Sequence, residues 1–145
     1  MTSELQIKKQ KPRVIAEIAI RDVTPPTDQN NMEKQIEWIC ECLGLAQGEN
    51  DLAAQIFKEL LKATKDQEGV STREIMEKEH VTQGAIVYHL NIFIQSGVVR
   101  KQGKYYFLRS TSLDRTMEEL ENDMLRQMRR MRELAKLIDK EIEGV

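Results

Sequence analysis

The chain is poor in cysteine, proline and aromatic residues: its 145 residues include 2 Cys and 3 Pro, and only 5% are aromatic. Two cysteines cannot form a disulfide framework, which excludes the small disulfide-stapled secreted domains. No run of about 18 apolar residues is present, and the first ten residues, MTSELQIKKQ, lack the apolar stretch of a secretory signal. We therefore expect a cytoplasmic protein with no membrane partner.

Carboxylates are missing from one long stretch of a chain whose net charge is −2. Residues 81–113 contain no Asp or Glu, whereas acidic residues outnumber basic ones by twelve to six between Asp28 and Glu79. The basic residues of the acid-free stretch are Arg100, Lys101, Lys104 and Arg109. Chance could produce such a bias, but a surface that binds an anionic partner would require it.

The length suits one compact domain with extensions rather than two full cores. We divide the chain into an N-terminal arm and linker (1–31), an accessory helix (32–47), a central domain (48–110) and a long C-terminal helix (111–145).

Three helices are expected in the central domain. Apolar residues recur at three- and four-residue steps between positions 52 and 61, after a possible N-cap at Asn50. Ser71 and Glu74 have the spacing of a capping box. Thr82 can cap a third helix, which places Ile86, Leu90, Phe93 and Ile94 on one face and ends at Gly97. The short connection between the second and third helices is typical of a helix-turn-helix.

After Gly97 the hydrophobic period changes to two. The segments VVRK and KYYFL flank Gln102-Gly103, which predicts a hairpin with Val99 opposite Tyr106 and Val98 opposite Phe107. The predicted fold class is therefore mainly α with a small β-hairpin wing: a winged helix-turn-helix followed by a long C-terminal dimerisation helix.

The stretch VTQGAIVYHLNIFIQSGVVRKQGKYYFL resembles the recognition helix and wing of winged-helix transcription regulators of the arsenic-repressor (ArsR) type, particularly archaeal-type members. The resemblance extends over residues 50–109 and is strongest from Thr82 onward, although the broader MarR-like winged helices share much of the motif. It implies a homodimer that regulates genes by placing the third helix in the major groove.

The residue types on that helix agree with binding to double-stranded DNA. Gln and Asn can pair with adenine, Val can contact a thymine methyl group, and a glycine lets the helix backbone approach closely. Ordinary surface residues are the alternative, but the helix has neither Lys nor Glu between positions 83 and 96. The candidate DNA-binding residues are Thr82, Gln83, Gly84, Val87, Tyr88, Asn91, Arg100, Lys101 and Lys104.

No catalytic, metal or cofactor site is expected. His89 lies beside core positions, where a packed and hydrogen-bonded side chain is the usual role, and the resemblance also assigns its equivalent to the scaffold. Cys40 and Cys42 match the Cys-x-Cys form of the family's metal sensors. However, they precede the domain, and two residues apart on a helix they point in different directions. We therefore interpret both as small buried residues and the protein as not an enzyme.

The segment 113–142 predicts one helix with a long apolar stripe, too long for a small domain to cover. We expect it to pair with a second subunit, together with the helix around Trp38, which has apolar residues on two faces. Folding back over its own domain is the alternative, and the methionines could also border a pocket for an unknown effector. The candidate dimerisation residues are Trp38, Met117, Leu120, Met124, Met128, Met131 and Ile138.

Two function classes remain open. The first is a homodimeric, sequence-specific regulator of transcription, and the second is a winged-helix protein-interaction module in a larger assembly, which the acidic segment keeps open. The arm 1–31 has no assigned role, although its lysines could contact phosphates.

Overall fold

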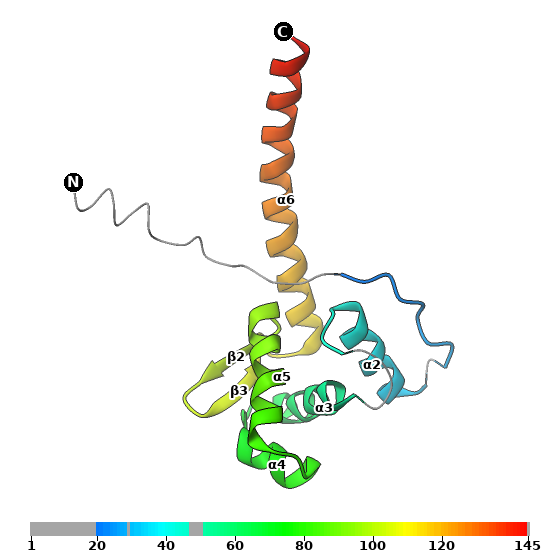
Figure 1. Cartoon of the computed structure of the whole chain (residues 1–145), viewed down its shortest axis with the longest axis vertical. Coiled ribbons are helices and arrows are strands. Elements are labelled where there is room, and N and C mark those ends of the chain that lie inside the picture. The colour runs from blue at the N-terminus through cyan, green and yellow to red at the C-terminus, as the bar shows by residue number, and fades with distance from the viewer. Residues whose placement is uncertain (1–19, 29, 47–50, 145) are drawn as a thin grey trace, which may run out of the picture.

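Five helices and three short strands follow one another in the computed structural model, which describes residues 20–28, 30–46 and 51–144 (Figure 1). The long last helix leaves the body of the molecule, and the other elements pack together at its base (Figure 1). In chain order the elements are α2 (Met32–Cys42), α3 (Leu52–Lys65), β1 (Val70–Ser71), α4 (Thr72–Glu79), α5 (Gln83–Ser96), β2 (Val99–Gln102), β3 (Tyr105–Leu108) and α6 (Leu113–Glu143). The mainly helical class with a small hairpin and a long C-terminal helix is confirmed.

Local capping sets the helix boundaries of the central domain. The Ser71 hydroxyl accepts a hydrogen bond from the backbone N–H of Glu74 at 3.2 Å, and Thr82 accepts one from Ala85 at 3.3 Å. Gly97 ends α5 with a φ of 87°, a left-handed conformation that glycine adopts without strain. The predicted caps at Ser71, Thr82 and Gly97 are confirmed. Asn50 lies outside the described residues, and Asp51 is the N-cap of α3.

The hairpin has a different register from the predicted one. Val99 pairs with Leu108 and Lys101 with Tyr106, so the two-residue turn is Gly103-Lys104 rather than Gln102-Gly103. Gly103 has a φ of 62° at the first turn position, where a type II′ turn requires a positive φ. Because both choices keep a glycine in the turn and an apolar residue opposite Val99, the period-two pattern could not distinguish them.

A third strand, which the sequence did not reveal, completes the sheet in the order β1-β3-β2. β1 pairs with β3 through Val70 and Tyr106. Just before β1, a Cβ atom at Gly69 would lie 2.6 Å from the Phe107 ring and 2.7 Å from Tyr105 Cβ, so only glycine allows this close approach. The sheet thus ties the start of α4 to the hairpin.

The core lies between α3, α5 and the sheet. The rings of Phe57 and Phe93 meet edge to face, with centroids 5.7 Å apart, and Ile86 and Leu90 are fully buried beside them. Of the four residues predicted to face inward on α5, Ile94 is only half-buried. The buried face orients α5 and leaves the opposite face in solvent.

The second face of α2 is covered by the chain's own N-terminal segment. The indole N–H of Trp38 donates to the backbone oxygen of Val23 at 2.9 Å, and the Arg21 N–H donates to the Cys42 oxygen at 2.8 Å. Residues 20–28 therefore supply a second partner for this helix, and the subunit interface at the half-buried Trp38 stays a prediction. Met32, in the first turn of α2, is 59% exposed.

Candidate nucleic-acid interface

A groove between α5 and the hairpin brings together five of the nine candidate DNA-binding residues. Gln83, Val87 and Asn91 line it from α5, and Lys101 and Lys104 line it from the hairpin. Thr72, at the start of α4, and Tyr106, on β3, complete the lining. There is no carboxylate among these lining residues, so the groove presents amide, methyl and ammonium groups together.

The α5 side chains are placed by the burial of the opposite helix face. Gln83, Val87 and Asn91 are four residues apart, which puts them one above another on a helix. Gln83 and Asn91 are exposed and Val87 is half-buried. The side-chain amides of Gln83 and Asn91 have no hydrogen-bond partner among the described residues, so they are available to a ligand.

Gly84 stands in open space on the exposed side of α5. A Cβ atom added at this position would have no heavy atom within 4 Å. Glycine inside a helix costs about 1 kcal/mol relative to alanine, and the fold provides no steric reason for it. A closely approaching partner would provide one.

Thr82 and Tyr88 lie beside the groove rather than in its lining. Thr82 is exposed and caps α5. Tyr88 is 64% exposed, and its ring meets the ring of His89 edge to face at 5.2 Å. A partner seated against the N-terminal half of α5 could therefore reach the Tyr88 hydroxyl.

Each basic side chain of the hairpin rests on an aromatic ring. The distance from the charged group to the ring centroid is 5.4 Å for Lys101 on Tyr106 and 5.3 Å for Lys104 on Tyr105. These contacts hold each ammonium group near a ring face, and both lysines remain exposed.

Arg100 lies on the other face of the hairpin, since successive residues of a strand point in opposite directions. Its guanidinium stacks 4.3 Å from the Phe107 centroid and donates to the Gln102 side chain at 3.2 Å. It lines a separate hollow with Thr64 and Gln67 at the end of α3. The structure therefore does not bring Arg100 together with Lys101 and Lys104.

Arg109, the fourth basic residue of the acid-free stretch, is already neutralised. Its Nε lies 3.3 Å from a Glu119 carboxylate oxygen, and its Nη2 donates to Asp123. The hydrogen bond from Arg109 holds the pKa of the Asp123 carboxyl below its usual value. Arg109 thus fastens α6 to the hairpin and is not free for an anionic partner.

Thr72 and Tyr106 were not predicted as groove residues. Thr72 follows the capping residue of α4 and carries no charge, so no local sequence signal distinguishes it. It reaches the groove only because β1 pairs with β3, which brings the start of α4 beside the hairpin. A two-residue strand is too short to be recognised from hydrophobic alternation.

His89 differs in part from its prediction. The side chain is half-buried, but its Nδ1 atom is enclosed without a hydrogen-bond partner, so the expected hydrogen bond is not found at that atom.

Cys40 is buried in the core, and burial raises the pKa of its thiol to about 12. Among the described residues, no group of three His, Cys, Asp or Glu side chains could hold a metal ion.

The candidate dimerisation residues of α6 fall into two groups. Leu120 is 3% exposed, and Met117 packs against the same core, so both are covered by their own chain. Leu120 therefore has no surface left for a subunit interface, whereas the assignment of the half-buried Met117 stays a prediction. Met128, Met131 and Ile138 are 49–56% exposed, and Met124 lies at the boundary, half-buried.

No protein-family model matches the chain, and the searches of curated proteins and of solved structures found no match. In the part of the chain that the structure describes, none of the helices combines the length and the apolar character needed to cross a membrane.

Proposed function

We propose that the protein is a sequence-specific, double-stranded DNA-binding regulator of transcription that acts as a homodimer. In this proposal α3, α4, α5 and the hairpin form a winged helix-turn-helix. α5 is its recognition helix in the major groove, and the hairpin is the wing on the phosphate backbone. The protein is proposed to have no catalytic activity.

The observation that carries the proposal is the groove in which Gln83, Val87 and Asn91 face Lys101 and Lys104 without a carboxylate. Gln and Asn amides present a donor and an acceptor side by side, which matches the edge of adenine in the major groove. The lysines supply positive charge for the neighbouring phosphates. An acidic residue in this lining would repel the same duplex.

The principal experiment selects binding sites for the full-length protein from random duplexes and then measures affinity for the selected site and for random DNA. Gln83→Ala and Asn91→Ala should cost about 1–3 kcal/mol on the selected site and little on random DNA. Gln95→Ala is a matched control, because Gln95 is an exposed amide on the same helix outside the groove. Equal losses on both DNAs for the Gln83 and Asn91 variants would remove α5 as the reading element.

The lysines should respond differently from the amides. Lys101→Ala or Lys104→Ala should weaken binding to every duplex and reduce the salt slope by about one unit for each lost phosphate contact. Arg100→Ala should have less effect on the slope, because Arg100 lies on the other face of the hairpin.

Gly84 gives a test in which stability and binding change in opposite directions. Gly84→Ala should stabilise folding by about 0.5–1 kcal/mol, because the added methyl group meets open space. The same methyl group should weaken DNA binding if the α5 backbone approaches the duplex closely. Unchanged affinity would show that this part of α5 stays away from DNA.

One observation favours the second candidate, a protein-interaction module. Glu33, Glu37, Glu59 and Glu79 line a different groove, along α2 and α3, together with Lys58 and Lys62. A partner with basic residues would suit this acidic groove better than DNA would. Absence of binding to any duplex at low salt would favour this module over the regulator.

A further inference from the structure

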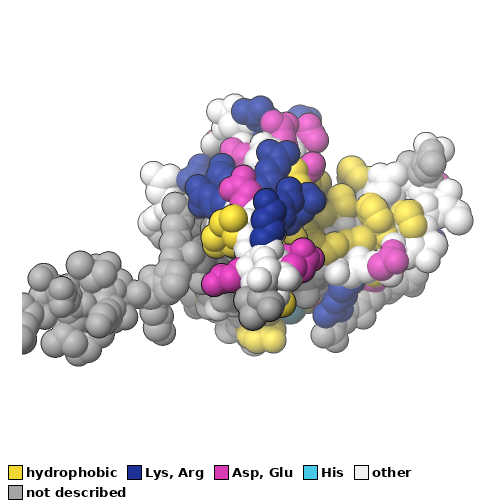
Figure 2. All heavy atoms as spheres, turned by 90° about the horizontal axis from the view of Figure 1, so that it is seen from above, with side chains coloured by type: hydrophobic (Ala, Val, Ile, Leu, Met, Phe, Trp, Pro, Cys, Tyr) yellow, Lys and Arg dark blue, Asp and Glu magenta, His cyan; other side chains and the backbone are white. Residues whose placement is uncertain are grey.

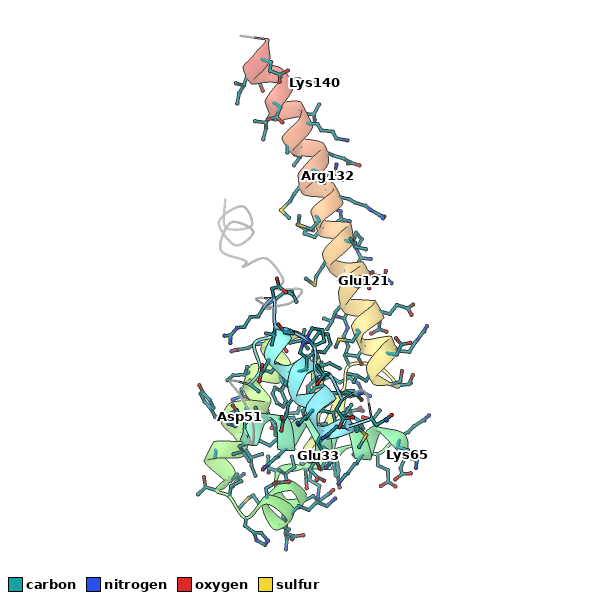
Figure 3. All side chains as sticks on the ribbon, turned by 90° about the vertical axis from the view of Figure 1, so that its right-hand side faces the viewer. Glu33, Asp51, Lys65, Glu121, Arg132 and Lys140 are labelled. Atoms are coloured by element: carbon teal, nitrogen blue, oxygen red, sulfur yellow. The ribbon has the colours of Figure 1, made fainter. Side chains whose placement is uncertain are left out.

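The outer half of α6 carries a row of exposed apolar side chains. Arg132 and Lys140, labelled in Figure 3, mark the part of the helix that rises clear of the other elements. Figure 2, which looks toward the free end of α6, shows hydrophobic side chains exposed next to basic ones. The exposed apolar residues are Leu125, Met128, Met131, Leu134, Leu137, Ile138 and Ile142, each between 42% and 69% exposed. Apolar groups at such a density on one helix indicate a contact surface.

This apolar row continues the face that the domain covers at the base of α6. Residues eleven apart lie just over three full turns apart and therefore nearly on one line along the helix. Leu120, Met131 and Ile142 form one such line, and Leu113, Met124 and Ala135 form another. Sulfur-bearing side chains of the helix project to the side on which the domain lies (Figure 3). The uncovered row therefore stands directly above the chain's own domain.

That placement restricts how a second copy can cover the row. In a parallel pair, the base of the partner's helix would occupy the face where Leu113, Met117 and Leu120 already contact their own core. In an antiparallel pair, the partner's helix reaches this face from the opposite direction, and the partner's described domain lies at the far end of the pair. We propose that the outer half of α6 pairs antiparallel with the same segment of a second copy of this chain.

The proposed register follows from the extent of the uncovered row. If Met124, where coverage by the domain ends, meets the partner's Ile142, then Met128 meets the partner's Ile138 and Met131 meets the partner's Ala135. The two-fold axis then passes level with Glu133. These residues recur in steps of four and three, as in the seam of a coiled coil. Arg126 and Arg129 lie on the opposite side of the helix, so their like charges remain in solvent.

This pairing deepens the proposed function, because it rests on the homodimer and specifies its geometry. The two domains lie at opposite ends of the paired helices, and the two Leu120 positions are about 39 Å apart along the axis.

Disulfide cross-linking distinguishes the two orientations. In the full chain with Cys40→Ala and Cys42→Ala, one preparation carries Met128→Cys and a second, tagged preparation carries Ile138→Cys. Mild oxidation of the mixture should give a mixed disulfide between the two variants, and each variant oxidised alone should remain mostly unlinked. Disulfides within each separate variant, with none between them, would establish a parallel pair and overturn the proposal.

A charge substitution with a matched control tests the partner without engineered cysteines. Met131→Glu should convert the protein to a monomer in sedimentation experiments at tens of micromolar. Arg129→Glu, two residues away and therefore on the opposite side of the helix, should leave the dimer intact. A monomeric unmodified chain, or equal effects of both substitutions, would overturn pairing with a second copy.

DNA binding is measured separately on the same preparations. Mixed disulfides without binding to any duplex would reject the proposed function and retain the antiparallel pair. Specific DNA binding with disulfides only within each separate variant would retain the function and reject this pairing.

Discussion

The base and the outer half of α6 have similar side chains at similar spacing, yet only the base is covered. Leu120 is 3% exposed, whereas Leu134, two heptads farther along the same helix, is 60% exposed. The base is also fastened by Arg109, which binds Glu119 and Asp123. The outer half has no contact of this kind with the described part of the domain.

This difference shows that an apolar stripe predicts burial without identifying the partner. A helix with one apolar face must cover that face, and for α6 the domain covers only the first turns. The same helix therefore contains a segment that stabilises the folded chain and a segment that is available to another chain. Substitutions in the two segments should affect different properties.

The largest expected effect is on folding, at the base. Leu120→Ala should lower the free energy of unfolding by about 2–5 kcal/mol, because it leaves a cavity among core residues. Leu134→Ala is the matched control, and it should have little effect on the unfolding of a dilute, monomeric sample. Urea denaturation followed by circular dichroism measures both. Similar losses for the two variants would abolish the distinction between base and outer half.

A smaller effect is expected from the fastening of the base to the hairpin. Arg109→Ala removes the bonds to Glu119 and Asp123 and should cost about 1–2 kcal/mol of stability. Arg126→Ala, which removes the more exposed of the two partners of Asp123, should cost less. The same denaturation experiment compares the two variants. If Arg126→Ala lowers the free energy of unfolding more than Arg109→Ala does, Arg109 is not the arginine that fastens α6.

The contribution of this ion pair should depend on pH. The pKa of Asp123 is lowered from its ordinary value of 3.8, chiefly by the hydrogen bond from Arg109. Because the folded chain binds this proton less readily than the unfolded chain, the contribution is complete above the unfolded pKa. It is lost as the pH falls through the folded pKa. The stability difference between the unmodified chain and Asp123→Asn should therefore be largest near about pH 6 and shrink in acid.

A carboxylate of the outer half provides the control for this pH series. Glu133 has no ion pair with the described residues, so Glu133→Gln should show no comparable decrease in acid. A difference for Asp123→Asn that stayed constant down to strongly acidic pH would contradict the role of its charge.

The smallest effect concerns reactivity rather than stability, and it extends the comparison to a second helix. Cys40 is buried with a thiol pKa raised to about 12, whereas Cys42 is half-buried. Because the thiolate is the reactive form, a maleimide reagent near neutral pH should modify Cys42 well before Cys40. Mass spectrometry of timed samples measures the order. Faster modification of Cys40 would show that the α2 face is not covered as described.

Several elements could be predicted from sequence because their signals are local. A cap requires a hydroxyl and a backbone N–H only three residues away, so Ser71 and Thr82 were recognisable. The three- and four-residue steps of α6 likewise predicted a long helix from residue 113. The solvent-facing side chains of α5 could be selected in the same way, because the buried positions 86, 90 and 93 leave the opposite face to solvent.

Other features depended on partners far away in the sequence. Amide and ammonium groups meet in the groove only because the hairpin packs beside α5. Thr72 joins them through the β1–β3 pairing, and Trp38 is covered by residues near Val23. Arg100 and Lys101 look alike in the chain, but the strand register places them on opposite faces of the hairpin.

The sequence by itself determined the helices, their caps and the acid-free character of residues 81–113, because each depends on residue type and on spacing within a few turns. Only the tertiary structure decided which charges remain free and which apolar residues remain uncovered. The charge of Arg109 is neutralised by carboxylates of α6, and Leu120 is buried whereas Met131 is exposed. The physical reason is that charge neutralisation and burial depend on which distant segments the fold brings into contact, and spacing along the chain does not specify this.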